Sequence, residues 1–276
     1  LSWSGPARPP VWETRFPDGQ SVRAELGTAG DQLLVYGDRA RFHLSADLGT
    51  ITCAARDEAD PHCQRFLLDT VLWWLCLSRG QQVVHAGAVE TERGVLAVAA
   101  ATGAGKTTLC AELLRRGASL FSDDVLVVER GAGGPIAYPG PPLMNLPSEA
   151  GYPADFGRAI ARFPAQAESW VAVERAAERP QPVAALFLLR RAPGLPLAAE
   201  RREATVLDLL PHLWGLPHAT EGPQERFQLA SDLAATTPIY DLTADPEVPA
   251  ATLADLVHGA VAGPVSEPIL EGSAAR

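Results

Sequence analysis

Lysine is almost absent from this chain of 276 residues: of its 23 basic side chains, a single one, Lys106, is lysine and the rest are arginine. Acidic side chains number 33, which gives a formal net charge of −10. Proteins that bind nucleic acid or an anionic membrane select for clustered Lys and Arg, so neither partner is expected. The one position that keeps lysine is a candidate for chemistry that needs a compact ammonium group.

Long apolar runs and paired cysteines are also missing. The apolar run 71–77 is far shorter than the ~20 residues that a membrane-spanning helix needs. Four irregularly spaced cysteines form neither a disulfide framework nor a CxxC metal motif. The first residues show no secretory signal pattern. We therefore expect a cytoplasmic protein with reduced thiols, and its 47 % of hydrophobic residues excludes global disorder.

The chain divides into two parts by its local patterns. Residues 1–60 alternate turn signals with short β-prone runs, which predicts a small β-rich N-terminal subdomain. Residues 61–264 alternate helical and strand patterns, which is typical of an α/β fold. Residues 265–276 are expected to form a flexible tail.

Within the second part, strands are expected at 82–89 and 94–100, and a helix at 106–116 that Gly117 ends. The second strand is apolar throughout, as a buried strand is. Further along the chain, we expect Gly- and Pro-rich loops at 131–135 and 138–147 and a short helix near 154–161.

A glycine-rich segment joins this apolar strand to the helix. Its sequence, Ala-Ala-Thr-Gly-Ala-Gly-Lys-Thr at 100–107, fits the pattern of a phosphate-binding loop, with alanine in place of the usual first glycine. The glycines let backbone N–H groups turn inward around phosphate oxygens. Lys106 would reach the β- and γ-phosphates, and the Thr107 hydroxyl would bind Mg²⁺. The predicted nucleotide-binding residues are Thr102, Gly103, Ala104, Gly105, Lys106, Thr107 and Thr108.

Two adjacent acids and one histidine complete the candidate site. Asp123 and Asp124 end a short strand that follows the loop by about one β-α-β unit, where a carboxylate can point at a metal ion. One acid would hold Mg²⁺ while the other takes a proton from an attacking hydroxyl; the alternative is that one is a helix cap or a surface acid. His85 lies in the apolar strand before the loop, so it is either a structural core residue or a neighbour of the γ-phosphate.

Three segments carry a resemblance to a known family. They are His-Ala-Gly-Ala-Val at 85–89, Thr-Gly-Ala-Gly-Lys-Thr-Thr at 102–108 and Arg-Gly-Ala-Ser-Leu-Phe-Ser-Asp-Asp-Val at 116–125. In this order they resemble the catalytic domain of HPr kinase/phosphorylase, and more closely the related biosynthetic kinases that phosphorylate lasso-peptide precursors. The resemblance is strong over 80–130 and weaker from there to about 262. It implies the phosphoenolpyruvate-carboxykinase-like variant of the P-loop fold, with ATP and Mg²⁺ as cofactors.

The resemblance also implies a role for each residue of the site. Lys106 and Thr107 would bind the triphosphate and the metal, and Asp123 would support the metal. Asp124, together with His85, would act at the accepting hydroxyl. Which of the two acids is the base stays open.

Two departures from the family limit what it implies. The stretch 136–146 has neither the Glu nor the Arg of the signature that contributes to phosphorylase activity in HPr kinases, so the reverse reaction and the HPr substrate are not expected. The N-terminal subdomain also looks different. The arginine pairs at 190–191 and 201–202 are expected to lie on solvated faces rather than to supply charge to the reaction.

The sequence therefore predicts an ATP- and Mg²⁺-dependent kinase. Its expected acceptor is a hydroxyl, foremost that of serine, on a peptide, a small protein or a serine-like small molecule. A homo-oligomer is a further candidate partner, although the hexamers of HPr kinases do not transfer to this sequence, which has lost much of their remaining pattern. One rival is a non-catalytic regulator that nucleotide switches between partner-binding states. A carboxykinase reaction on oxaloacetate is disfavoured, because the chain has no second lysine for the dicarboxylate site.

Overall fold

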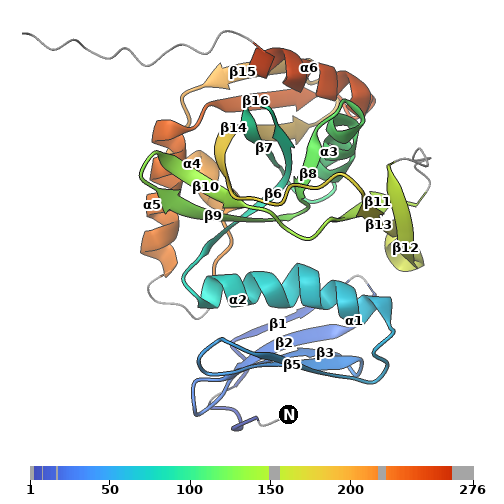
Figure 1. Ribbon diagram of the computed structural model, residues 1–276, viewed down its shortest axis with the longest axis vertical. Coiled ribbons are helices and arrows are strands. Elements are labelled where there is room, and N and C mark those ends of the chain that lie inside the picture. Colours follow the sequence, from blue (N-terminus) through green and yellow to red (C-terminus); the bar gives the residue numbers. More distant parts are fainter. Residues whose placement is uncertain (1–2, 8, 17, 149–155, 217–221, 263–276) are drawn as a thin grey trace, which may run out of the picture.

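The computed structural model describes residues 3–7, 9–16, 18–148, 156–216 and 222–262 (Figure 1). The predicted tail at 265–276 lies outside them. No helix in these ranges is both long enough and apolar enough to cross a bilayer.

An antiparallel sheet of five strands occupies the N-terminal part, with each strand paired to the next along the chain. Its inward faces are apolar: Val22, Leu34 and Phe42 are almost fully buried. The strands are β1 (Trp12–Arg15), β2 (Ser21–Leu26), β3 (Gln32–Tyr36), β4 (Ala40–Leu44) and β5 (Ile51–Ala55).

A helical segment covers this sheet and separates it from the rest of the molecule (Figure 1). It consists of α1 (Pro61–Phe66), a π-helical turn η1 (Leu67–Val71) and α2 (Leu72–Ser78). Asp60 caps its start by accepting a hydrogen bond from the backbone N–H of His62. Phe66 and Trp74 share a buried core with the N-terminal sheet. The predicted domain boundary after residue 60 stays a prediction, although this segment packs on the sheet that precedes it.

A second, eight-stranded sheet forms the centre of the remaining chain, in the order β10-β9-β6-β7-β14-β16-β15, with β8 paired to β6. Among the paired strands that the structure describes in this sheet, β14 pairs in parallel with β7 and with β16, and the other pairings are antiparallel. The fold is thus a mixed α/β structure with several sheets. The strands are β6 (Gln82–Thr91), β7 (Gly94–Ala99), β8 (Ser119–Ser122), β9 (Val125–Gly131), β10 (Gly134–Tyr138), β14 (Gln181–Arg191), β15 (Ala198–Arg202) and β16 (Ile239–Ala244).

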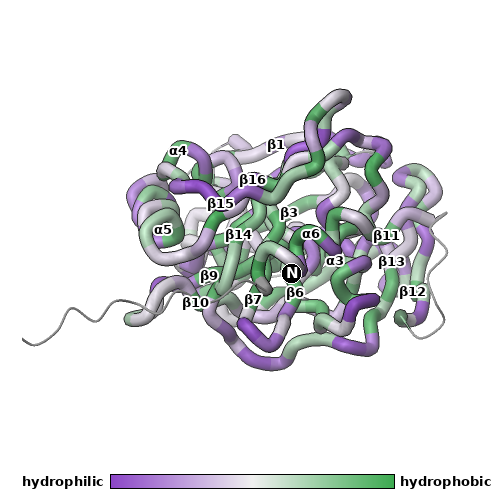
Figure 2. The backbone as a smooth tube through the Cα atoms, turned by 90° about the horizontal axis from the view of Figure 1, so that it is seen from above, coloured by the Kyte–Doolittle hydropathy of each residue, from purple (hydrophilic) through white to green (hydrophobic). Residues whose placement is uncertain are grey.

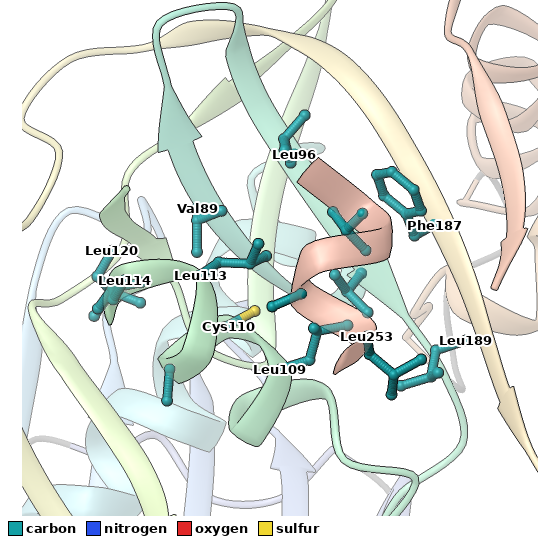
Figure 3. Close-up of a cluster of buried hydrophobic side chains, with 14 of the residues drawn as sticks. Val89, Leu96, Leu109, Cys110, Leu113, Leu114, Leu120, Phe187, Leu189 and Leu253 are labelled. Atoms are coloured by element: carbon teal, nitrogen blue, oxygen red, sulfur yellow. The ribbon is translucent and has the colours of Figure 1, made fainter. Parts of the chain in front are cut away.

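Helices cover both faces of this sheet, which explains why β7 is apolar throughout. Leu96 and Val98 of β7 pack into the core beneath α3 and α6 (Figure 3). Their neighbours Val95, Ala97 and Ala99 pack into the core on the opposite face. Figure 2 shows the hydrophobic stretches gathered in the interior. The helices are α3 (Lys106–Arg115), α4 (Val206–Leu209), the 3₁₀ turn η3 (Leu210–His212), α5 (Gly222–Thr236) and α6 (Ala250–Ala262).

A small third sheet contains the clearest departures from the sequence-based expectations. It is formed by β11 (Leu143–Pro147), β12 (Gly157–Phe163) and β13 (Glu168–Val173), with the 3₁₀ turn η2 (Pro164–Gln166) between the last two. The predicted loops at 131–135 and 138–147 are wrong in part, because the ends of β10 fall within them and β11 lies within the second. The helix predicted near 154–161 is also wrong over 157–161, where pairing with β13 overrides the helix propensity of the alanines. Residues 154–155 lie outside the described residues.

Candidate active site

The glycine-rich loop 101–105 connects the end of β7 to the start of α3, as the sequence predicts. Gly103 and Gly105 have φ of +80° and +97°, a left-handed conformation that favours glycine. The loop is exposed at Thr102 and half-buried at Ala104. Thr108 is half-buried in the first turn of the helix. The N–H groups at this helix start, together with the helix dipole, favour an anion in front of the loop.

Lys106 is the first residue of α3, and its side chain is only 5 % exposed. Its Nζ lies 3.1 Å from Nε2 of His85 and 3.6 Å from Oδ1 of Asp124. The ammonium group donates to Nε2, so Nδ1 carries the imidazole proton, and this nitrogen lies 3.3 Å from the carbonyl oxygen of Asp124. Burial and, after it, the nearby Lys106 charge lower the pKa of His85. His85 is thus a neutral residue of the site and not an isolated core histidine.

Gly87 explains how the lysine reaches this histidine. It lies two residues after His85 on β6, on the same face of the strand. A Cβ atom at this position would lie 2.9 Å from Sγ of Cys110 and 3.9 Å from Cβ of Lys106. The missing side chain therefore lets the first turns of α3 approach β6 closely.

Asp123 contacts Thr107, the residue that follows the lysine on α3. Its Oδ1 accepts a hydrogen bond from the Thr107 hydroxyl at 2.9 Å, and its Oδ2 accepts one from the backbone N–H of Asn145 at 2.8 Å. Burial and, after it, the charge of Asp124 raise the pKa of Asp123 well above its ordinary value. Neither of these two hydrogen-bond partners is charged, so neither offsets the burial of a negative charge.

The donor set at Thr107 and Asp123 fits Mg²⁺. A hydroxyl and a carboxylate supply the oxygen ligands that this ion prefers, and Mg²⁺ in nucleotide sites keeps waters and phosphate oxygens as its other ligands. The described part of the chain contains no group of three or more His, Cys, Asp or Glu side chains that could enclose a metal by themselves. Thr107 and Asp123 therefore suit a metal ion that takes its other ligands from water and from the phosphates of a nucleotide. When bound, it would neutralise charge on the β- and γ-phosphates.

Asp124 has an unusual backbone that brings both acids to the site. Its φ is +62°, a left-handed conformation that is uncommon outside glycine and is tolerated by Asp better than by most residues. The turn is tight, with the N–H of Val125 donating to the carbonyl of Asp123 at 2.8 Å. Adjacent side chains of a regular strand point to opposite faces. Here the break after β8 turns one carboxylate toward Thr107 and the other toward Lys106.

A third acid, which the sequence reasoning missed, lies beside this pair. Asp69 is in the π-helical turn η1 and its Oδ2 is 3.4 Å from Nδ2 of Asn145 and 3.0 Å from Nε of Arg65. Burial raises the pKa of Asp69 to about 6, although Arg65 opposes the shift. Single-turn π-helices occur often at functional sites. The signal that could have revealed it is an acid alone within the apolar run 66–77.

The arginine pairs divide unevenly between solvent and protein. Arg190 and Arg201 are exposed, as predicted. Arg191 is half-buried instead: its guanidinium donates to the carbonyl of Pro246 at 2.7 Å, and another of its nitrogens would lie 3.5 Å from a Cβ at Gly105. Arg202 forms ion pairs with acidic side chains. The expectation that both pairs are merely solvated is therefore wrong for Arg191, which adjoins the glycine-rich loop.

Comparisons with known proteins add little to this geometry. No protein-family model matches the chain, and no curated protein is significantly similar to it in sequence. One similar solved structure is that of the HPr(Ser) kinase/phosphatase from Coxiella burnetii, with 11 % sequence identity and a TM-score of 0.38. The alignment covers 66 % of this chain and 97 % of the other. A similarity this low transfers no residue roles, so the chemistry of the site rests on the contacts described above.

Proposed function

We propose that this chain is an ATP-dependent kinase that transfers the γ-phosphoryl group to a hydroxyl, foremost that of serine, on a peptide, a small protein or a serine-like small molecule. The observation that carries the proposal is the convergence of one buried lysine, two adjacent carboxylates and a neutral histidine at the loop that precedes α3. Phosphoryl transfer needs this combination of positioning, charge neutralisation and a proton acceptor.

The phosphates would occupy the space in front of the glycine-rich loop. Backbone N–H groups of the loop would bind phosphate oxygens, and Lys106 would turn from His85 to the β- and γ-phosphates. Thr107 and Asp123 would hold Mg²⁺. The Arg191 guanidinium lies next to Gly105 and would add positive charge beside the loop.

Asp124 is the better candidate for the base. Both oxygens of Asp123 already accept hydrogen bonds, whereas Asp124 is 35 % exposed and its Oδ1 lies 3.6 Å from the Lys106 ammonium group. Once Lys106 binds phosphate, the Asp124 carboxylate is available to take the proton of the acceptor hydroxyl. The hydroxyl oxygen then forms a bond to the γ-phosphorus, the bond from that phosphorus to the β,γ-bridging oxygen breaks, and ADP leaves.

The test is transfer from ATP to serine-containing peptides with Mg²⁺, followed by mass spectrometry for the added phosphate. Asp124→Asn should lose nearly all transfer while it keeps ATP affinity, and Asp123→Asn should raise the Mg²⁺ concentration that transfer requires. Asp232→Asn is the matched control, because this acid pairs with Arg130 away from the loop. Full transfer by Asp124→Asn would overturn its assignment as the base. ATP hydrolysis that is equally fast with and without every acceptor tried would overturn the kinase.

The same variants separate the kinase from a nucleotide-dependent switch, because a switch that only binds ATP should tolerate Asp124→Asn. The compartment is part of the proposal as well. All four cysteines are free thiols, which fits a reducing compartment, and we place this activity in the cytoplasm.

A further inference from the structure

A cavity of about 340 Å³ lies where the N-terminal sheet and the helical segment meet the rest of the chain. Its walls are unusually rich in aromatic rings, and we call it the aromatic cavity. Its aromatic lining consists of Trp12, Phe16, Tyr36, Phe66, Trp73 and Trp214.

The aromatic cavity reaches the candidate active site through a row of rings. The ring of Trp12 lies 6.2 Å from that of Trp73, which in turn lies 5.1 Å from that of Trp214. Trp214 stacks on His85, with centroids 5.0 Å apart and planes inclined by 19°. One ring therefore links the cavity to the histidine that contacts Lys106, because Trp214 lines the cavity and stacks on His85.

Asp69 forms a second connection between the cavity and the site. It lines the cavity, and its carboxylate lies beside Asn145, whose backbone N–H binds Asp123. The helical segment that carries Asp69 lies between the N-terminal sheet and the central sheet (Figure 1). A molecule in the cavity would thus contact Trp214, which stacks on His85, and Asp69, which lies beside Asn145.

The lining has features that a ligand would satisfy. Trp12, Phe16, Trp73 and Trp214 are all only half-buried, so apolar ring surface faces the cavity, and covering it would be favourable. The side-chain oxygen of Gln166, another lining residue, is buried and has no hydrogen-bond partner within the described part of the chain. A ligand with an N–H group could donate a hydrogen bond to this oxygen.

The charges at the cavity do not select a charged ligand. The Arg65 guanidinium is held at 3.0 Å by Asp69 and at 2.7 Å by Glu168, so its charge is already compensated. The volume is at the lower end of the ~300–1,000 Å³ of ligand pockets. It suits one large side chain with its peptide groups and not a folded partner.

We propose that the aromatic cavity receives an aromatic side chain of the phosphoryl acceptor, which makes the preferred acceptor a peptide with a tryptophan or similar residue next to the accepting serine. This proposal rests on the kinase function proposed above. An indole suits the lining because it covers the rings and offers its N–H to Gln166. The neighbouring serine would then lie toward His85 and Asp124.

A smaller cavity of about 230 Å³ is the competing location. It also touches Asp69, but it lies on the side of Asp123 whose carboxylate oxygen is already taken by Asn145. Leu143 lines this smaller cavity and not the aromatic one. A variant at Leu143 is therefore a matched control for one at Trp73.

The experiment uses the full chain and synthetic pentapeptides with a central serine, in which the adjacent residue is glycine, leucine or tryptophan. We expect kcat/KM for the tryptophan peptide to exceed that of the glycine peptide by at least about tenfold. Trp73→Ala and Gln166→Leu should each reduce this ratio, whereas Leu143→Ala should leave it unchanged. Gln166→Leu changes one partly exposed side chain, so it serves if Trp73→Ala fails to fold.

A tryptophan peptide with alanine in place of serine separates the two proposals, since calorimetry reads its binding without any transfer. Transfer with equal kcat/KM for all three peptides would overturn the aromatic cavity as acceptor site and leave the kinase standing. A ratio lost in Leu143→Ala and kept in Trp73→Ala and Gln166→Leu would also overturn it, in favour of the smaller cavity. A third outcome is that no peptide is phosphorylated although the alanine peptide binds wild type and not Trp73→Ala. This would overturn both the kinase function and the role of the aromatic cavity as acceptor site.

Discussion

The N-terminal sheet and the region around the glycine-rich loop differ in the kind of side chain that they bury. In the sheet, apolar rings pack against one another, as where Tyr36 stacks on Phe66 with centroids 4.6 Å apart. At the loop, the polar side chains of Lys106, His85 and Asp123 are buried or half-buried; each has hydrogen-bond partners, but neither partner of the Asp123 carboxylate is charged. Burial of this second kind costs stability unless a ligand completes it. The first region therefore supplies stability, and the second gives up some of it for binding and chemistry.

The largest expected effect comes from removing the single lysine. Lys106→Met should reduce phosphoryl transfer by at least ~10³-fold, because it removes the ammonium group that would neutralise charge on the β- and γ-phosphates. The free energy of unfolding should change by less than about 1 kcal/mol, since methionine fills the space and the partly exposed Asp124 can be hydrated. Transfer rates and urea unfolding of the same preparation provide the measurement. Activity within tenfold of wild type would contradict the assigned role.

The converse variant lies in the N-terminal sheet. Phe42 is 1 % exposed, and Phe42→Ala should lower the free energy of unfolding by about 3–5 kcal/mol through lost burial and a cavity. Because Phe42 lies far from the loop in the fold, kcat of the folded fraction should stay close to wild type. Urea unfolding and single-turnover transfer measured side by side test the pair. A large loss of kcat with unchanged stability would contradict the view that the N-terminal sheet contributes stability and not chemistry.

How much the sequence predicts depends on how far apart the contacting residues are along the chain. The loop, Lys106 and Thr107 follow from one contiguous motif, and the strand and helix beside it follow from local periodicity. Asp69 and Asn145 are 76 positions apart, and the carbonyls that Arg191 binds lie 54 to 57 positions after it. No local pattern encodes such contacts. The same reason explains β10 and β12, whose glycine- and alanine-rich sequences become strands only because partners pair with them.

A smaller effect is expected at Gly87, where α3 packs closely against β6 beside the candidate active site. A methyl group there would meet Sγ of Cys110 at 2.9 Å, so Gly87→Ala should push α3 away from β6 and cost about 1–3 kcal/mol of stability. The displacement should also raise KM for ATP, because it moves the start of α3 relative to His85. Ala88→Gly on the opposite face of the strand is the control, and it should leave KM for ATP unchanged. Equal KM values for wild type and Gly87→Ala would show that the close approach is dispensable for the nucleotide site.

The smallest expected effect concerns Asp31, a buried charge of the N-terminal sheet. Asp31 is 5 % exposed, and its carboxylate accepts hydrogen bonds from Ser4 and from Nε2 of His43, the latter at 2.8 Å. Burial by itself raises the pKa of Asp31, but the hydrogen bonds from Ser4 and His43 outweigh it, so the pKa is lowered.

The sign of the pH dependence follows from that lowered pKa. The stability that this carboxylate contributes is fully present above its unfolded pKa of about 3.9 and is lost as pH falls through the folded value. Asp31→Asn should therefore lower the free energy of unfolding by about 1 kcal/mol at neutral pH, and by progressively less below about pH 4. Asp38→Asn, whose side chain is 69 % exposed, is the control and should show no such trend. Urea unfolding of the three proteins across this pH range decides the matter: a constant difference between wild type and Asp31→Asn would mean that packing, and not the carboxylate's charge, is what Asp31 contributes.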